Sequence, residues 1–194
     1  GQVLVMAPWN YPFQLAIAPV IAALAGGNTV ILKPSEMAPH TASVLEKIIQ
    51  SSFDPQVFKV LDGDASLAQK LLGLPFDFCF FTGSTQVGRK VMELAAQNLI
   101  PVCLELGGKS PALVDASADI DLSARKIIWG KFFNAGQTCV APDYVWAHEK
   151  IYEELLHKLA FYIKEFFGQD AAKSPDFGRI INEKHFLRLQ SLHS

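Results

Sequence analysis

The first half of the chain alternates short apolar runs with longer stretches whose apolar residues recur at helical spacing. Such alternation predicts β-strands that are each followed by an α-helix. Because the apolar runs lack a polar–apolar alternation, they indicate a parallel sheet covered on both faces. The predicted strands are Val3–Ala7, Thr29–Leu32, Val57–Leu61, Phe78–Phe81 and Val102–Leu106. The predicted helices are Gln14–Leu24, Thr41–Gln50, Ser66–Leu72 and Thr85–Ala96.

Beyond Lys109 the pattern continues less regularly. The paired glycines Gly107 and Gly108 form a plausible hinge, so we expect one domain over residues 1–107 and another over 108–194. The fold class is therefore α/β, with a Rossmann-like parallel-sheet domain followed by the beginning of a second α/β domain. The elements expected in the second domain are strands Pro111–Val114 and Tyr144–Ala147, helices Leu122–Phe133 and Tyr152–Phe167, and a loop over Asn134–Gln137.

Both ends of the sequence have the pattern of regular structure. Gly1 leads directly into an apolar strand pattern, and Phe186–His193 has the pattern of a helix still in progress. Natural chain ends are more often loosely ordered. We therefore expect the sequence to be a fragment of a longer chain.

Composition narrows the class of protein. Half of the residues are hydrophobic and 19% are charged, which supports a packed core and argues against disorder. The net charge of −2 and the lack of a basic stripe disfavour nucleic acid and anionic membranes as partners. Three sparse cysteines suggest neither a disulfide framework nor a zinc site. The apolar stretch Leu15–Ala25 is too short for a bilayer, and no signal peptide is evident, so we predict a cytoplasmic protein.

Unusual polar or glycine-rich sequence follows four of the predicted strands. The carboxyl ends of parallel strands are where such sheets bind ligands, so these four segments predict the site. They are Pro8-Trp9-Asn10, Lys33-Pro34-Ser35-Glu36, Thr82-Gly83-Ser84 and Glu105-Leu106-Gly107-Gly108.

Two of these segments suit a nucleotide, although no GxGxxG fingerprint occurs. Gly83–Gly88 lies between a strand and a helix, where free N–H groups and the helix dipole favour a phosphate. The alternative is that Ser84 merely caps the helix. Glu36, beside Lys33, has the chemistry to accept hydrogen bonds from ribose hydroxyls. The alternative there is a surface turn that opens the next helix.

Three further residues have catalytic chemistry. Cys139 lies in a loop flanked by Gly and Pro, where dipoles or cations could favour a nucleophilic thiolate, whereas Cys79 and Cys103 lie in strands as small hydrophobes. Glu105 ends an apolar strand, and burial there would suit a general base acting on water. Asn10 could donate to an oxyanion. The alternatives are an inert loop cysteine, a structurally capped carboxylate and a turn asparagine that bonds its own backbone.

Taken together, these segments resemble the aldehyde dehydrogenase superfamily. The matching stretches follow one another in the family's order and spacing. The run Asn134–Tyr144, which includes Ala141-Pro142-Asp143-Tyr144, resembles the class 3 branch, which handles medium- to long-chain aliphatic and aromatic aldehydes. The resemblance spans the whole chain. The stretches are Pro8–Pro12, Gly27–Glu36, Phe81–Thr85, Leu104–Pro111 and Gly136–Cys139.

The resemblance implies NAD(P)-dependent oxidation of an aldehyde to a carboxylic acid. Cys139 would carry a thiohemiacetal and then a thioester, Asn10 would hold the oxyanion, and Glu105 would activate the hydrolytic water. Tyr11 would line the substrate tunnel, and no metal is implied. NAD is the implied cofactor, with NADP possible, and a homodimer is the implied assembly of the whole protein. The implied cofactor contacts are Trp9, Lys33, Glu36, Thr82, Gly83, Ser84, Val87, Gly88 and Leu106.

Two other functions remain open from the sequence. A Cys/Glu acyl transferase or thioesterase would use Cys139 and Glu105 but not Lys33, Glu36 or the Gly83–Gly88 loop. A truncated, non-catalytic nucleotide-binding fragment would keep the motifs without a complete site. Neither needs an aldehyde.

Overall fold

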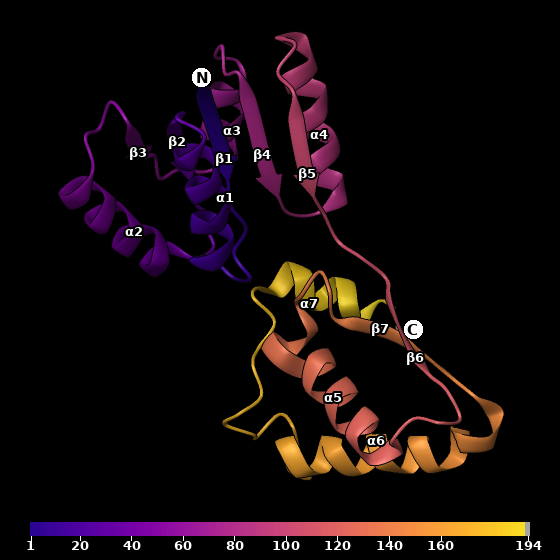
Figure 1. The fold of residues 1–194 in the computed structure, drawn as a ribbon. Helices are drawn as coiled ribbons and strands as arrows, with labels where there is room; N and C mark the ends of the chain where they lie inside the picture. The colour runs from indigo at the N-terminus through magenta and orange to yellow at the C-terminus, as the bar shows by residue number, and fades with distance from the viewer. Residues whose placement is uncertain (193–194) are drawn as a thin grey trace. The chain divides into compact units, whose positions relative to one another are not determined.

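The computed structural model describes residues 1–192, which form two compact units divided between Gly107 and Gly108 (Figure 1). His193, which the sequence pattern places in a helix still in progress, lies outside the described residues. Each unit has its own buried core and its own sheet.

The first unit is a five-stranded parallel sheet with helices in the connections (Figure 1). Its strand order is β3-β2-β1-β4-β5. The chain therefore adds β2 and β3 on one side of β1, and then adds β4 and β5 on the other side. This is the arrangement of a Rossmann-like half, and it confirms the predicted α/β class. The elements are β1 Gln2–Met6, α1 Gln14–Ala25, β2 Thr29–Lys33, α2 Pro39–Ser52, β3 Phe58–Val60, α3 Ala65–Leu72, β4 Phe78–Thr82, α4 Thr85–Gln97 and β5 Val102–Glu105.

The two faces of this sheet have separate cores. Alternate residues of each strand point to opposite faces, so β1 sends Val3 and Val5 to one face and Leu4 and Met6 to the other. Helices α1 and α2 cover the first of these faces, and α3 and α4 cover the second. Both faces of β1 are buried, which explains its unbroken apolar sequence.

Local sequence sets several helix ends. Pro39 begins α2, where its missing N–H costs nothing. The Asp64 side chain accepts hydrogen bonds from the Ser66 and Leu67 N–H groups and so starts α3. Gly27, with φ +74°, adopts the left-handed conformation after α1 that glycine reaches without strain.

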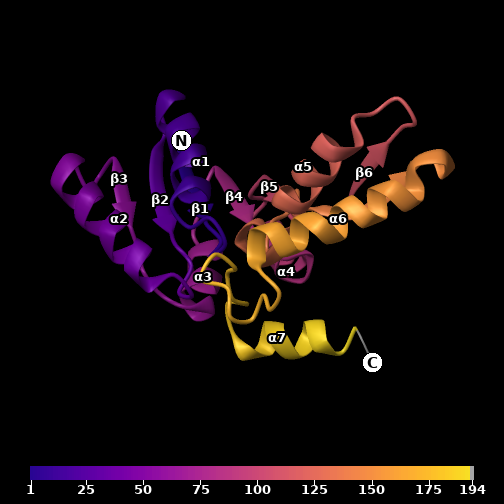
Figure 2. The same cartoon turned by 90° about the horizontal axis from the view of Figure 1, so that it is seen from below.

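The second unit pairs two parallel strands (Figure 1) and packs two long helices together (Figure 2). The α5–α6 core contains Ile128 and Leu155, and across it Asp121 accepts hydrogen bonds from Lys158 and Tyr162. The elements are β6 Ser110–Val114, α5 Ile120–Phe132, the 3₁₀ turn η1 Phe133–Gly136, β7 Pro142–Ala147, the 3₁₀ turn η2 Glu149–Ile151, α6 Tyr152–Phe167 and α7 Glu183–Gln190.

Two expectations for the second unit need correction. Helix α7 ends at Gln190, capped by Ser191, rather than continuing from Phe186 to His193. The predicted loop Asn134–Gln137 is mostly a tight 3₁₀ turn, in which Asn134 and Ala135 have positive φ angles. Asn134 tolerates that conformation and Gly136, with φ +76°, reaches it freely, whereas Ala135 adopts it at a cost in free energy.

Candidate functional site

The carboxyl ends of four strands meet at one edge of the first unit's sheet. Met6 of β1 pairs with Lys33 of β2 on one side and with Phe81 of β4 on the other. Thr82 of β4 pairs in turn with Glu105 of β5. The strand order reverses between β1 and β4, and parallel sheets bind ligands outside such a reversal. The structure therefore brings the predicted cofactor residues of this unit to one edge.

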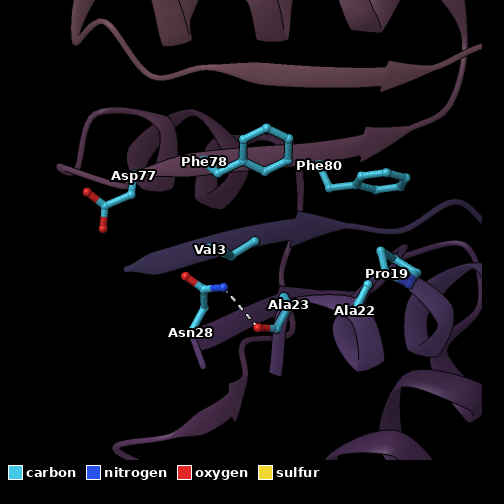
Figure 3. A pocket seen from close by; sticks show the side chains of 8 residues that line it. All are labelled: Val3, Pro19, Ala22, Ala23, Asn28, Asp77, Phe78 and Phe80. Carbon is cyan, nitrogen blue, oxygen red and sulfur yellow. Dashed lines mark hydrogen bonds between the residues drawn. The ribbon is translucent and has the colours of Figure 1, made fainter. Parts of the chain in front are cut away.

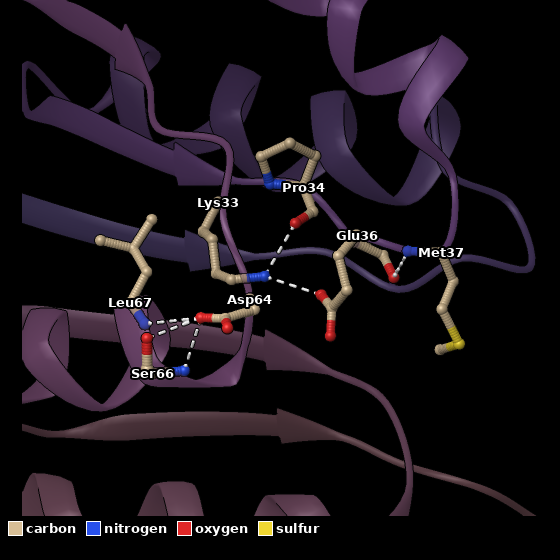
Figure 4. Close-up of polar contacts among 8 residues, drawn as sticks. Lys33, Pro34, Glu36, Met37, Asp64, Ser66 and Leu67 are labelled. Carbon is tan, nitrogen blue, oxygen red and sulfur yellow. Dashed lines mark hydrogen bonds and ion pairs between the residues drawn. The ribbon is translucent and has the colours of Figure 1, made fainter.

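Lys33 and Glu36 form a direct ion pair at this edge (Figure 4). The Lys33 Nζ lies 3.0 Å from Glu36 Oε2 and donates a second hydrogen bond to the Pro34 carbonyl at 3.0 Å. The Lys33 side chain is only 7% exposed, whereas that of Glu36 is 48% exposed. A buried ammonium requires such partners. The pair thus presents a carboxylate to solvent from a fixed position at the end of β2.

The turn from β4 into α4 is compatible with both predictions for the Gly83–Gly88 segment, a helix cap at Ser84 and a phosphate site. The Ser84 hydroxyl accepts a hydrogen bond from the Val87 N–H, so Ser84 does cap α4. A Cβ on Gly83 would lie 2.5 Å from the buried Phe81 ring, and one on Gly88 would lie 2.6 Å from Leu106 Cδ2. The glycines therefore allow close packing of the helix onto the sheet. The same turn presents the N-terminus of a 13-residue helix, as a phosphate site requires.

Thr82 and Glu105 are neighbours at the carboxyl ends of β4 and β5. Their Cα atoms are register partners, and the Gly83 N–H donates to the Glu105 carbonyl at 3.0 Å. Glu105 is exposed, so the burial expected from its apolar sequence context is not found. The reason is that β5 is the edge strand and Glu105 is its last residue.

Trp9, Asn10 and Tyr11 lie on the turn between β1 and α1, and all three are half-buried. The Tyr11 carbonyl accepts a hydrogen bond from the Leu15 N–H at the start of α1. The turn is therefore anchored at both ends, by the last residues of β1 and by the first turn of α1. This placement puts Asn10 directly beyond the central strand.

Cys139 lies in the second unit, half-buried between η1 and β7. The chain at Gly108 passes so close that a Cβ there would lie 2.8 Å from the Cys139 carbonyl oxygen. One residue later, Lys109 Nζ forms an ion pair with Asp143 Oδ2 at 2.6 Å. Lys109 lowers the pKa of the Asp143 carboxyl below its ordinary value through this hydrogen bond. The cysteine loop is thus fixed to the segment that immediately follows Gly107.

The other two cysteines occupy different surroundings. Cys79 is fully buried in β4, and desolvation raises the pKa of its thiol to about 12. Cys103 is half-buried in β5. The expectation that Cys79 acts as a small hydrophobe is confirmed.

An apolar cavity in the first unit contains none of the predicted site residues (Figure 3). It is bounded by Val3 near the start of β1, by Phe78 at the start of β4, and by Pro19 and Ala22 of α1. These positions are nearer the amino ends of the strands, away from the edge where the polar segments gather. The cavity therefore has no part in the candidate site.

The part of the chain that the structure describes lacks two features, a membrane-spanning helix and a metal-binding cluster. No helix among residues 1–192 is both long and apolar enough to span a membrane. Within the same residues, no cluster of three or more His, Cys, Asp or Glu side chains could hold a metal ion.

A model of the family described as "Aldehyde dehydrogenase family" matches residues 1–194. The chain belongs to the aldehyde dehydrogenase family. The predicted resemblance is confirmed.

Curated aldehyde dehydrogenases match almost the entire chain. It is 50% identical to the 4,4'-diaponeurosporen-aldehyde dehydrogenase of Staphylococcus aureus and 49% identical to the dimeric NADP-preferring aldehyde dehydrogenase of Mus musculus. In each case 99% of this chain covers 42% of the relative. It is 46% identical to aldehyde dehydrogenase family 3 member A2 of Pongo abelii, where 99% of the chain covers 40% of the relative. The chain therefore spans about two fifths of these relatives.

A solved structure agrees with these relatives. The structure described as the substrate-bound state of Staphylococcus aureus AldH is 50% identical and superposes with a TM-score of 0.90. The superposition covers 99% of this chain and 42% of that one.

The candidate residues of this aldehyde dehydrogenase chain lie in both of its units. The first unit gathers Lys33, Glu36 and the Gly83–Gly88 turn at one edge, with Glu105 and Asn10 beside them. The second unit holds Cys139. Sequence reasoning missed the ion pair of Asp143 with Lys109 and the side-chain contacts of Gln137. The only sequence signal for Gln137 was its place two residues before Cys139.

Proposed function

We propose that the protein carrying this chain oxidises an aldehyde to a carboxylic acid with NAD or NADP. The observation that carries the proposal is the family membership, together with the gathering of Lys33, Glu36 and the Gly83–Gly88 turn at a strand-order reversal. Medium- to long-chain aliphatic or aromatic aldehydes are the proposed substrates. Support comes from a relative named for a diaponeurosporen-aldehyde and from relatives of family 3.

The first unit has the side chains that a dinucleotide needs. Lys33 uses donors toward Pro34 and Glu36, and an ammonium has three donors in all, so a ribose hydroxyl is a suitable further acceptor. The exposed Glu36 carboxylate would accept from ribose hydroxyls. The first N–H groups of α4, at Thr85 and Gln86, would face the pyrophosphate. Trp9, Thr82, Val87 and Leu106 would line the rest of the cofactor cleft.

The same pair bears on cofactor choice. A 2′-phosphate on the ribose would meet the Glu36 carboxylate, which favours NAD through charge repulsion. Lys33 is 3.0 Å from that carboxylate and offsets part of its charge, which is compatible with some use of NADP. One relative is named NADP-preferring.

The chemical step uses residues from both units. When bound, the nicotinamide accepts a hydride. The Cys139 thiolate forms a C–S bond to the carbonyl carbon, and the π electrons move to oxygen as a thiohemiacetal oxyanion. The Asn10 side-chain amide and the Cys139 backbone N–H would hold that oxygen. The C–H hydride then leaves, the C=O bond re-forms, and the acyl group remains on sulfur as a thioester.

Hydrolysis completes the cycle. Glu105, exposed at the end of β5, would take a proton from a water molecule that attacks the thioester carbonyl. The C–S bond breaks, the carboxylic acid leaves, and the Cys139 sulfur is returned as thiolate. Tyr11, on the same turn as Asn10, would line the aldehyde tunnel.

Cofactor reduction with two variants tests this function. The whole protein would be mixed with octanal or benzaldehyde and NAD, and the absorbance of reduced nicotinamide followed. Glu105→Gln is expected to give one rapid burst and then little turnover, whereas Cys139→Ala is expected to give neither. Thioester exchange without cofactor reduction would favour an acyl transferase or thioesterase instead, and NAD binding without either reaction would indicate a non-catalytic module.

Two further properties concern the whole protein. We propose a homodimer, for which the support is a relative that is named dimeric. A cytoplasmic location remains a prediction from the sequence.

A further inference from the structure

The Gln137 side chain holds together two segments of the second unit that are far apart in sequence. Its Nε2 donates to the Asn134 carbonyl at 3.1 Å and to the Arg179 carbonyl at 3.1 Å. Its Oε1 accepts from the Ile181 N–H at 2.9 Å. One amide therefore uses both its donor and its acceptor ends to fix the turn before Cys139 against residues 179–181.

That turn has a backbone that needs such support. Asn134, Ala135 and Gly136 have φ angles of 52°, 53° and 76°, so three consecutive residues adopt the left-handed conformation. Gly reaches this conformation freely and Asn tolerates it, but Ala does so only at a cost in free energy. Strained backbone of this kind persists only when the contacts around it hold it in place. Gln137 is the first residue after the three, and its hydrogen bond to Asn134 closes the turn.

The segment on the other side of Gln137 is itself well anchored. The Arg179 guanidinium donates to the Ala172 carbonyl at 2.7 Å and to the Phe177 carbonyl at 2.5 Å. The Phe177 ring packs on Phe167 with centroids 5.1 Å apart. Gly178 lies against the turn, since a Cβ there would be in ordinary contact with Ala135 at 3.7 Å. Residues 177–181 thus form a fixed support rather than a loose strand.

We propose that Gln137 is a positioning residue that holds the Cys139 sulfur and backbone N–H in the geometry needed for acylation. The inference depends on the proposed function, because it assigns Gln137 a role in the step that Cys139 performs. Gln137 acts through the backbone and does not touch the reacting atoms. Displacing a nucleophile by about 1 Å can cost on the order of 100-fold in rate, so a support two residues away matters.

Two substitutions separate the hydrogen bonds from the size of the side chain. Gln137→Glu keeps the shape and an acceptor but removes the N–H donors, and it places a carboxylate against the carbonyls of Asn134 and Arg179. Gln137→Met keeps the length and removes all the polar contacts. The matched control is Gln97→Glu, the same change at an exposed position at the end of α4 in the other unit.

The experiment uses the whole protein with benzaldehyde and NAD. The burst rate constant of reduced cofactor reports acylation, and the NAD dissociation constant, the KM for benzaldehyde and the thermal unfolding midpoint are measured alongside. Both Gln137 variants are expected to slow the burst at least about 10-fold, while NAD affinity and the unfolding midpoint stay close to wild type. Gln97→Glu is expected to match wild type throughout.

The results distinguish a failure of the positioning role of Gln137 from a failure of the proposed function. A burst rate within about twofold of wild type in both folded variants would overturn the positioning role. So would a loss of the unfolding transition and NAD binding together with the burst, because Gln137 would then support the fold. If Cys139→Ala keeps the burst, the proposed function itself fails. If Cys139→Ala abolishes it and the Gln137 variants are normal, only this inference fails.

Discussion

Two adjacent glycines in this chain differ in what a side chain would meet. A Cβ on Gly107 would find no atom within 4 Å, whereas one on Gly108 would lie 2.8 Å from the Cys139 carbonyl oxygen. The Cys139 backbone cannot move aside as easily as the flexible end of a side chain can. The requirement for glycine is therefore specific to position 108, where the chain leaves the first unit and passes the nucleophile loop.

A pair of alanine substitutions tests this difference. Gly108→Ala is expected to displace the Cys139 loop and slow the acylation burst about 10- to 100-fold, since small misplacements of a nucleophile are costly. Gly107→Ala is expected to retain a burst within about twofold of wild type. Equal effects of the two changes would mean that the close approach to Cys139 is unimportant.

Cys79 and Cys139 are expected to differ in reactivity. Cys79 is fully buried, and desolvation raises its pKa to about 12 from 9.0, so at pH 9 only about a thousandth of it is thiolate. Because burial raises the pKa of the Cys79 thiol, the thiol stays almost fully protonated, and so unreactive toward alkylation, below the ordinary thiol pKa. The thiolate fraction becomes large only as the pH rises toward 12. Iodoacetamide at pH 7.5 and 9, followed by peptide mass mapping, is expected to label Cys139 and leave Cys79 unmodified. Labelling of Cys79 in the folded protein would contradict its burial.

One face of helix α6 packs in the core of the second unit and contributes to its stability. Leu155 is 2% exposed in the α5–α6 core, and its neighbour Leu156 is 48% exposed. A leucine with this burial loses both its transfer free energy and its packing when it is truncated.

Alanine substitution at each leucine tests this assignment. Leu155→Ala is expected to lower the free energy of unfolding by about 2–5 kcal/mol, measured by urea denaturation. Leu156→Ala is expected to cost much less. A similar loss at both positions would mean that α6 packs through a different face.

At the level of elements, the sequence was informative where local patterns decide the structure. The five strands of the first unit appeared as apolar runs, because strands buried on both faces need apolar residues throughout. Helix ends were less certain, since propensity changes little over one turn; α7 ends at Gln190 although its pattern predicted continuation to His193. Glu105 was expected to be buried, but the position of β5 at the sheet edge depends on strand order, which no local pattern contains.

The parts of the site that escaped prediction depend on contacts between distant residues. Gln137 contacts Arg179, 42 residues later, and Asp143 contacts Lys109 across the β6–β7 pair. No spacing rule joins such positions before the fold is known. By contrast, Lys33 and Glu36 are three residues apart, and their pairing follows from the turn after β2.

For the whole molecule, the candidate groups are shared between two units. Asn10, Lys33, Glu36 and Glu105 belong to the first unit, and Cys139 belongs to the second. The proposed oxidation requires the sulfur of one unit to receive the acyl group while groups of the other hold the oxyanion and the cofactor.

Direct detection of the acyl group on Cys139 tests this account most sharply. The Glu105→Gln variant of the whole protein would be mixed with NAD and octanal, quenched in acid within the burst, and digested for mass mapping. We predict a mass increase of one octanoyl group on the Cys139 peptide, matched in amount to the reduced NAD, and none when NAD is left out. Reduced NAD formed in full while the Cys139 peptide remains unmodified would contradict the central claim.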